Sequence, residues 1–359
     1  MSISVRYIVA AACCVAVLFA ASLFLGSVPI PLRAVLGILT GGEAGQASWS
    51  FIVLESRLPQ AVTALLAGAA LATSGLMLQT VFNNPLAGPS ILGIDTGASL
   101  GVAFVVLLSG QLGGVALSRL GFIGEVALSI AAVVGALSVM GLIVLASRKV
   151  AGSVTLLIIG VMIGYIANAV IGVLKFFSVE EDIKAYVIWG LGSFARVSGN
   201  QMMLFVTIMA VIIPFSFLLI KPLNLLMLGD GYARNLGLNI NRARVWVITC
   251  AGVLTAIVTA YCGPIIFLGL AVPHLCRAIF LGLAVPHLCR AIFQTSDHRV
   301  LMPTAMLVGA SLALLCNLIA RLPGFEGALP VNSVTALVGA PVVASVLFGK
   351  RKRKDAIEF

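Results

Sequence analysis

The histidine and acidic side chains of this chain are the groups to consider first, because they carry most acid–base and metal chemistry. The three histidines are His274, His287 and His298, and the first two are copies of one Pro-His pair in a repeated segment. No H-E-x-x-H pattern or cluster of acids accompanies them, and a Pro-His pair at a helix end is more often structural than a ligand. We therefore predict no catalytic residue, no cofactor and no metal site.

Two further kinds of chemistry need features that the sequence lacks. It has no G-x-x-x-x-G-K-[ST] motif, so we expect no P-loop nucleotide site on this chain. Asp95 and Glu125 are candidate intramembrane charges, but both lie near the ends of apolar runs. A proton relay needs several titratable groups at mid-depth, and the sequence offers none there. This argues against an ion-coupled secondary transporter. That class stays the alternative, with a passive channel or a structural membrane protein as a third possibility.

The composition indicates which solvent surrounds these residues. Apolar residues make up 61% of the 359-residue chain and charged residues only 9%, against about 25% in a soluble protein. Lipid must therefore cover most of the surface, and each helical span needs about 20 apolar residues. Continuous apolar runs predict an all-α membrane protein of about ten transmembrane helices, near 7–27, 59–81, 90–110, 122–146, 154–176, 201–220, 245–262, 263–293, 299–320 and 334–348.

Lys and Arg in the short loops predict the orientation, because they accumulate on the cytoplasmic side. With both termini in the cytoplasm, fourteen basic residues lie inside and seven outside, and Arg277 is unassigned. The net charge of +10 is then concentrated on the cytoplasmic face. Contact with anionic membrane lipid explains this charge better than binding of nucleic acid does.

The loops leave room for one domain, so we predict a single transmembrane domain over 1–359. Three loops are longer than the rest: 28–57, 177–200 and 221–244. The first two are predicted outside, and residues 31–40 of the first could form an amphipathic helix on the membrane. The third is predicted in the cytoplasm.

One feature of the sequence is abnormal. FLGLAVPHLCRAI occurs at 267–279 and again, letter for letter, at 280–292. Thirteen residues add about 20 Å of helix, so both copies cannot occupy the same depth in one straight span. We expect the first copy to fill the membrane and the second to be surplus; the alternative is that the second copy takes the membrane position and the first is extruded outside.

Three stretches resemble one transporter family. They are RLPQAVTALLAGAALATSGLMLQTVFNNPLAGPSILGIDTGASLG at 57–101, LGDGYARNLGLN at 228–239 and GPIIFLGLAVPHLCR at 263–277. Together they resemble the FecCD-type permeases of ABC importers, which move iron-siderophores, haem or vitamin B12. The resemblance implies a ten-helix subunit of the bacterial inner membrane that catalyses nothing itself and moves its substrate by ATP-driven alternating access.

The resemblance also implies partners and the sites for them. These partners are two ABC ATPase subunits in the cytoplasm, a periplasmic substrate-binding protein and a second permease subunit, with a homodimer expected and a heterodimer left open. The cytoplasmic segment matches the family's coupling helices, which implies contact with the ATPase through Leu228, Gly229, Asp230, Tyr232, Ala233, Arg234, Leu236 and Gly237. Arg57 and Arg321 match positions that receive acidic residues of the binding protein, although Gln60 stands where relatives often have another basic residue.

The translocation pathway is the last feature that the resemblance implies. Gly152 and Ser153, before the fifth run, match the family's cytoplasmic gate. The fifth helix lines the pathway in relatives, and its polar members here are Tyr165 and Asn168. The choice among siderophore, haem and cobalamin is not readable from the residues, because the binding protein recognises the substrate.

Overall fold

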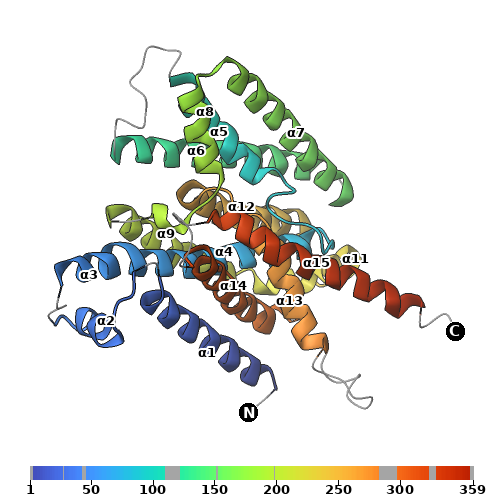
Figure 1. Cartoon of the computed structure of the whole chain (residues 1–359). Coiled ribbons are helices and arrows are strands. Elements are labelled where there is room, and N and C mark those ends of the chain that lie inside the picture. Colours follow the sequence, from blue (N-terminus) through green and yellow to red (C-terminus); the bar gives the residue numbers. More distant parts are fainter. Residues whose placement is uncertain are drawn as a thin grey trace. The chain divides into compact units, whose positions relative to one another are not determined.

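The structure is a computed structural model, and it describes residues 3–26, 28–42, 46–109, 122–150, 153–197, 199–282, 297–322 and 329–355. Every regular element within these ranges is a helix (Figure 1). The all-α prediction is therefore confirmed.

Each of the ten predicted apolar runs corresponds to a helix. The helices are α1 (Ile3–Phe24), α4 (Leu58–Val81), α5 (Ile94–Ser109), α6 (Phe122–Lys149), α7 (Ser153–Phe177), α9 (Gly199–Phe217), α12 (Ile240–Cys262), α13 (Leu268–Gly282), α14 (His298–Ala320) and α15 (Val331–Asp355). In the described part, five helices are long and apolar enough to span a membrane, and α9 forms a sixth span with α10 (Ile220–Leu226) across a bend of 46°. Shorter apolar helices lie within α1, α5 and α15.

The loops hold shorter helices. Helix α2 (Leu32–Leu39) confirms the helix predicted at 31–40, and α3 (Ala47–Phe51) continues through a π-helical stretch, η1 (Ile52–Arg57), into α4. The remaining short elements are α8 (Glu180–Gly190), the 3₁₀ turn η3 (Phe194–Arg196) and α11 (Asp230–Asn235).

The chain folds into two compact units, which are described separately. The first comprises 1–76, 197–203 and 266–359. In it α1 lies along α14, and α13 packs against both α14 and α15 (Figure 1). Helix α4 meets α14 at Gly68 and Gly309: a Cβ on Gly68 would lie 2.3 Å from the carbonyl oxygen of Gly309. Small residues therefore bring these two backbones into direct contact, as is common between membrane helices.

The first copy of the tandem segment forms most of α13. A Cβ on Gly75 of α4 would lie 1.7 Å from the carbonyl oxygen of Gly269, so α13 touches α4 backbone to backbone. His274 and Cys276 of this copy are buried. The amide of Ile266, just before the copy, donates to Oδ1 of Asn332 at 3.1 Å. The second copy beyond Gly282 lies outside the described residues.

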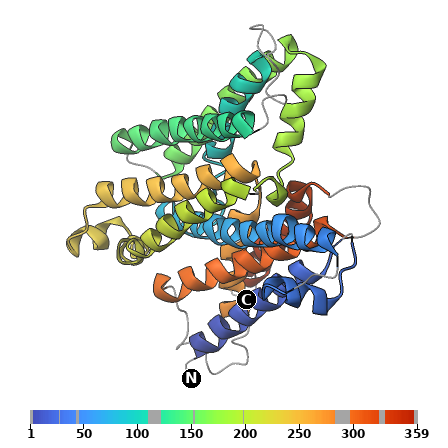
Figure 2. The ribbon, with the colours of Figure 1, turned by 90° about the vertical axis from the view of Figure 1, so that its left-hand side faces the viewer.

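The second unit comprises 77–196 and 204–265. Helices α5 and α6 cross at glycines, because a Cβ on Gly101 would lie 2.0 Å from the carbonyl oxygen of Ala131 and one on Gly135 would lie 2.1 Å from that of Gly97. Helix α12 runs beside α6 (Figure 2), where Gly252 accommodates the side chain of Met140. Helices α7 and α8 also pack on α5.

Candidate functional site

The predicted coupling segment is a pair of short helices, α10 and α11, that precede α12. Gly229 is the N-cap of α11 with φ +92°, and Gly237 follows its end with φ +85°. After α11 the amide of Gly237 donates to the carbonyl of Arg234 and that of Leu238 donates to Ala233, at 2.9 and 3.0 Å. This is a Schellman motif, which needs a left-handed residue that glycine adopts without strain. The two glycines thus fix both ends of α11.

Three large apolar side chains on and beside α11 are exposed. Leu228, Tyr232 and Leu236 are four residues apart, and they are 55%, 72% and 61% exposed. The resemblance also implies an ATPase contact for Ala233, but this residue is fully buried on the inner side of the segment. The prediction of its place is therefore wrong, because a helix turns neighbouring residues about 100° apart and Ala233 follows Tyr232 directly.

Polar contacts attach the segment to α12. Arg244 of α12 forms an ion pair with Asp230 through Nη2 and Oδ2, 2.8 Å apart. Asn239 caps α12, because its Oδ1 accepts from the amide of Arg242 at 3.0 Å. Arg234 stays exposed. No sequence rule joins residues 230 and 244, so the ion pair was not predicted, whereas an Asn directly before an apolar helix is a recognisable N-cap signal.

Arg57 lies in the interior of the first unit. Only 1% of it is exposed, and its guanidinium donates to the carbonyls of Leu23 and Phe24 from Nη1, at 3.0 and 2.9 Å, and to that of Val28 from Nη2. These carbonyls are at and just beyond the end of α1, where a helix has no donors of its own. A cation there also suits the helix dipole, so Arg57 fixes the C-terminal end of α1.

Arg321, at the end of α14, lies beside Arg57. A Cβ on Gly26 would be 3.0 Å from Nη2 of Arg57 and 3.1 Å from Nη2 of Arg321, so both guanidinium groups touch the same glycine. Burial, and then the charge of Arg57, lower the pKa of Arg321 from its usual range. Within the described residues, Nε of Arg57 and Nη1 of Arg321 are buried and have no hydrogen-bond partner. The sequence predicted neither this proximity nor the burial of Arg57.

The predicted pathway residues lie on the exposed side of α7. Tyr165 is 72% exposed and Asn168 is exposed as well. Gly152 lies outside the described residues, and Ser153 is the first residue of α7, although its side chain is not described. Helix α7 is held against the start of α5, where a Cβ on Gly160 would be 3.0 Å from Cα of Leu92. The exposed polar residues of α7 thus face away from the unit's own core.

The buried carboxylate of Asp95 connects three parts of the second unit. One oxygen accepts from the hydroxyl of Ser90 at 2.5 Å and the other from that of Thr259 on α12 at 2.8 Å. The carboxylate is also in the first turn of α5, where the helix dipole favours a negative charge. Both oxygens are therefore used to hold the loop, α5 and α12 together. Across the described residues, no group of three or more His, Cys, Asp or Glu side chains is arranged to hold a metal ion.

Comparisons with known proteins agree with this architecture. The profile of the FecCD transport family matches residues 14–280 and 278–349, and the two matches meet inside the tandem segment. The vitamin B12 import system permease protein BtuC of Klebsiella pneumoniae is 34% identical over 313 residues, 87% of each chain. Its namesake in Citrobacter koseri is 35% identical over 337 residues, 91% of this chain and 93% of that one.

A solved structure has the same fold. It is described as an inward-facing conformation of a metal-chelate type ABC transporter, and it superposes with a TM-score of 0.78 at 26% identity. The match covers 96% of this chain and 99% of the other. The chain therefore belongs to the FecCD transport family: it is a multi-pass permease of the inner membrane, a transport subunit of an ABC importer and not an enzyme.

Proposed function

We propose that this chain moves a metal chelate of the cobalamin, iron-siderophore or haem class into the cytoplasm as one half of a permease dimer. The vitamin B12 permeases among its relatives support cobalamin as the first substrate to test. The structurally similar metal-chelate type ABC transporter supports the wider class of metal chelates. Energy would come from ATPase subunits, and delivery from a substrate-binding protein.

The coupling segment is the observation that carries this proposal. Leu228, Tyr232 and Leu236 form an exposed apolar row: Tyr232 is on α11, and Leu228 and Leu236 flank it, next to the two glycines that fix its ends. Exposed apolar groups grouped in this way are typical of a surface that a partner covers. The ion pair between Asp230 and Arg244 would transmit a displacement of this row to α12. We therefore propose that the ATPase subunit contacts the chain at this segment.

The exposed face of α7 supports a pathway shared with a second copy. Only 22% of the most apolar stretch of α7 is buried within the chain, and Tyr165 and Asn168 lie on its exposed side. Asp95, by contrast, has both oxygens engaged by hydroxyl groups, which favours a packing role over proton transfer. This contrast favours the ATP-driven importer over an ion-coupled transporter.

Two tyrosines of equal exposure provide the test. Tyr232 and Tyr165 are both 72% exposed, so Tyr232→Ala and Tyr165→Ala remove the same group without opening a core cavity. The full chain would be expressed with its neighbouring ATPase and binding protein, and ATPase co-purification and uptake of radiolabelled cobalamin would be measured. We expect Tyr232→Ala to lose the ATPase and uptake, and Tyr165→Ala to keep the ATPase while uptake changes.

Other outcomes have definite meanings. ATPase retention by Tyr232→Ala at the wild-type level would refute the coupling site. Uptake that persists without the ATPase and stops when a protonophore is added would refute the importer mechanism. Where cobalamin is not taken up, the same assay with a ferric siderophore and haem identifies the substrate within the class.

A further inference from the structure

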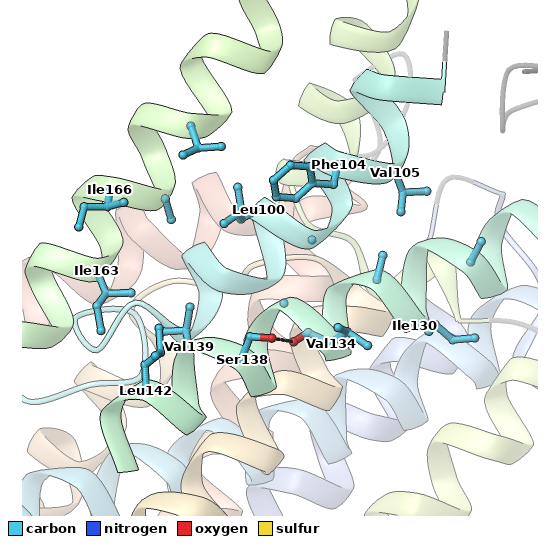
Figure 3. Close-up of a pocket in the computed structure, with 16 residues that line it drawn as sticks. Leu100, Phe104, Val105, Ile130, Val134, Ser138, Val139, Leu142, Ile163 and Ile166 are labelled. Carbon is cyan, nitrogen blue, oxygen red and sulfur yellow. Dashed lines mark hydrogen bonds between the residues drawn. The ribbon is translucent and has the colours of Figure 1, made fainter. Parts of the chain in front are cut away.

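A groove in the second unit has no role in the proposed transport cycle. It lies between α5, α6 and α7, with a volume of about 800 Å³ (Figure 3). Helices α6 and α7 both pack on α5, and side chains of all three helices line the groove. Leu100 and Phe104 of α5 form its floor, with Ile130 and Val134 of α6 on one wall and Ile166 of α7 on the other.

The lining of the groove excludes a polar ligand. All the lining residues are apolar or glycine except Ser138. The Ser138 hydroxyl donates to the carbonyl of Val134 in its own helix at 2.8 Å, as Figure 3 shows, so its proton is already used. A chelate, a carboxylate or a phosphate would lose its hydration here without gaining partners, which is unfavourable. The occupant must therefore present hydrocarbon to the groove.

The groove is also at membrane depth. Both walls belong to candidate spans, 123–149 and 154–177, and only 28% and 22% of their most apolar windows are buried within the chain. The lining residues on α6 run from Ala127 to Leu142, about 22 Å along the helix axis. This length fits within a hydrocarbon core of about 30 Å. Water has no polar partner in such a groove, so lipid chains are the available filling.

A pair of basic residues lies beyond one end of the groove. Arg148 and Lys149 are in the last turn of α6, six and seven residues after Leu142, which is about 9–10 Å along the axis. Both are exposed, and neither forms an ion pair within the described residues. Basic residues at the membrane surface attract anionic lipid headgroups. An apolar groove followed by a basic end matches an amphipathic anion.

We propose that this groove binds an anionic phospholipid, whose acyl chain lies along α6 and whose headgroup lies at Arg148 and Lys149. This site is separate from the proposed transport function. A second copy of the chain fits the basic end less well, because each copy carries a net charge of +10. The lipid instead supplies the opposite charge together with the hydrocarbon.

Native mass spectrometry of the full-length detergent-solubilised protein tests this site. The protein would be titrated with phosphatidylglycerol and with phosphatidylethanolamine, and bound lipids would be counted. Since each basic residue near an anionic surface contributes about fivefold, we expect Arg148→Gln with Lys149→Gln to weaken phosphatidylglycerol binding by up to about 30-fold. Arg6→Gln removes an exposed basic residue of the other unit, so it is the matched control and should change little.

The apolar part is tested by filling the groove. Ser138→Phe and Val134→Phe place a ring inside it and should reduce binding of both lipids, whereas Leu137→Phe, on the same helix but not in the lining, should not. Unchanged lipid counts in both groove variants, or an unchanged preference for phosphatidylglycerol without the two basic residues, would overturn the proposal. So would groove variants that convert a dimer to monomers at constant lipid count, since a second copy would then be the occupant.

Discussion

Enlarging one buried alanine in the first copy of the tandem segment should destabilise the protein, whereas the same change in the second copy should not. Ala271 of α13 is fully buried and faces Gly339 of α15. A Cβ on Gly339 would lie 3.7 Å from that of Ala271 and only 2.7 Å from that of Phe267, so α15 leaves no space there. Ala271→Leu adds three carbon atoms at this contact. Overpacking of this kind costs about 1–3 kcal/mol.

The matched control is Ala284→Leu. Ala284 occupies the same place in the second copy, within the same letters LAVP, so the two variants have the same composition and the same mean hydropathy. If the first copy is the one that packs, Ala284→Leu should change the free energy of unfolding by less than about 0.5 kcal/mol, as substitutions outside packed sites usually do.

Heating the detergent-purified full chain with a thiol-reactive dye measures this difference once the exposed Cys13 and Cys14 are replaced by Ser, because Cys250, Cys262, Cys276 and Cys316 are buried in the folded protein. We expect a lower midpoint for Ala271→Leu only. A larger loss for Ala284→Leu would show that the second copy fills the site, and equal losses would show that neither copy is surplus. Deletion of 280–292 extends the test: the shortened chain should be at least as stable and as active as the full chain.

Three further predictions concern the coupling segment and the outer side. Gly237→Pro should uncouple uptake from ATPase activity, because proline cannot adopt φ +85° and lacks the amide hydrogen that Gly237 donates to the carbonyl of Arg234. Gly231→Ala is the control: a Cβ there meets no neighbouring atom and Gly231 has no positive φ, so this variant should behave as wild type. Arg57→Gln should lower the free energy of unfolding by about 1.5–3 kcal/mol for each charged hydrogen bond lost, and a thermal midpoint equal to that of the wild type would contradict this. Arg321→Gln should keep the wild-type stability and reduce the salt dependence of binding-protein capture. An unchanged salt dependence of capture would contradict the docking role of Arg321. Burial and then the charge of Glu181 raise the pKa of Asp182. The fold is therefore more stable with this carboxyl protonated: the added stability is fully present below about pH 3.9 and is lost as the pH rises through the pKa of Asp182 in the folded state. Asp182→Asn should unfold at a higher temperature than wild type at pH 7 and lose this advantage in acid.

The spans could be predicted because lipid imposes a pattern on each helix separately. Each apolar run had to form a helix, since unpaired backbone groups are too costly in hydrocarbon. The coupling segment was also predictable in outline, because Gly229 and Gly237 mark helix ends by themselves. These features depend on residues close together in the chain.

Other features depend on contacts between distant residues and were not predictable. Arg57 was expected at an outer docking surface, but it is buried against the end of α1, more than thirty residues earlier in the chain. Nothing in the letters around Arg57 indicates that the carbonyls of Leu23 and Phe24 lie within its reach. Ala233 shows the same limit at short range: its apolar character fits both faces of α11, and only packing selects the inner one.

The glycine contacts of α4 have a consequence for movement. Gly68 and Gly75 are seven residues apart, about two helical turns, so they lie on nearly the same face of α4 and touch α14 and α13 respectively. No side chain of either glycine interlocks with the neighbouring helix. Sliding by a fraction of a turn therefore meets less resistance than separation does. This geometry suits shear of α13 and α14 along α4, in which packed helices stay in contact while they are displaced.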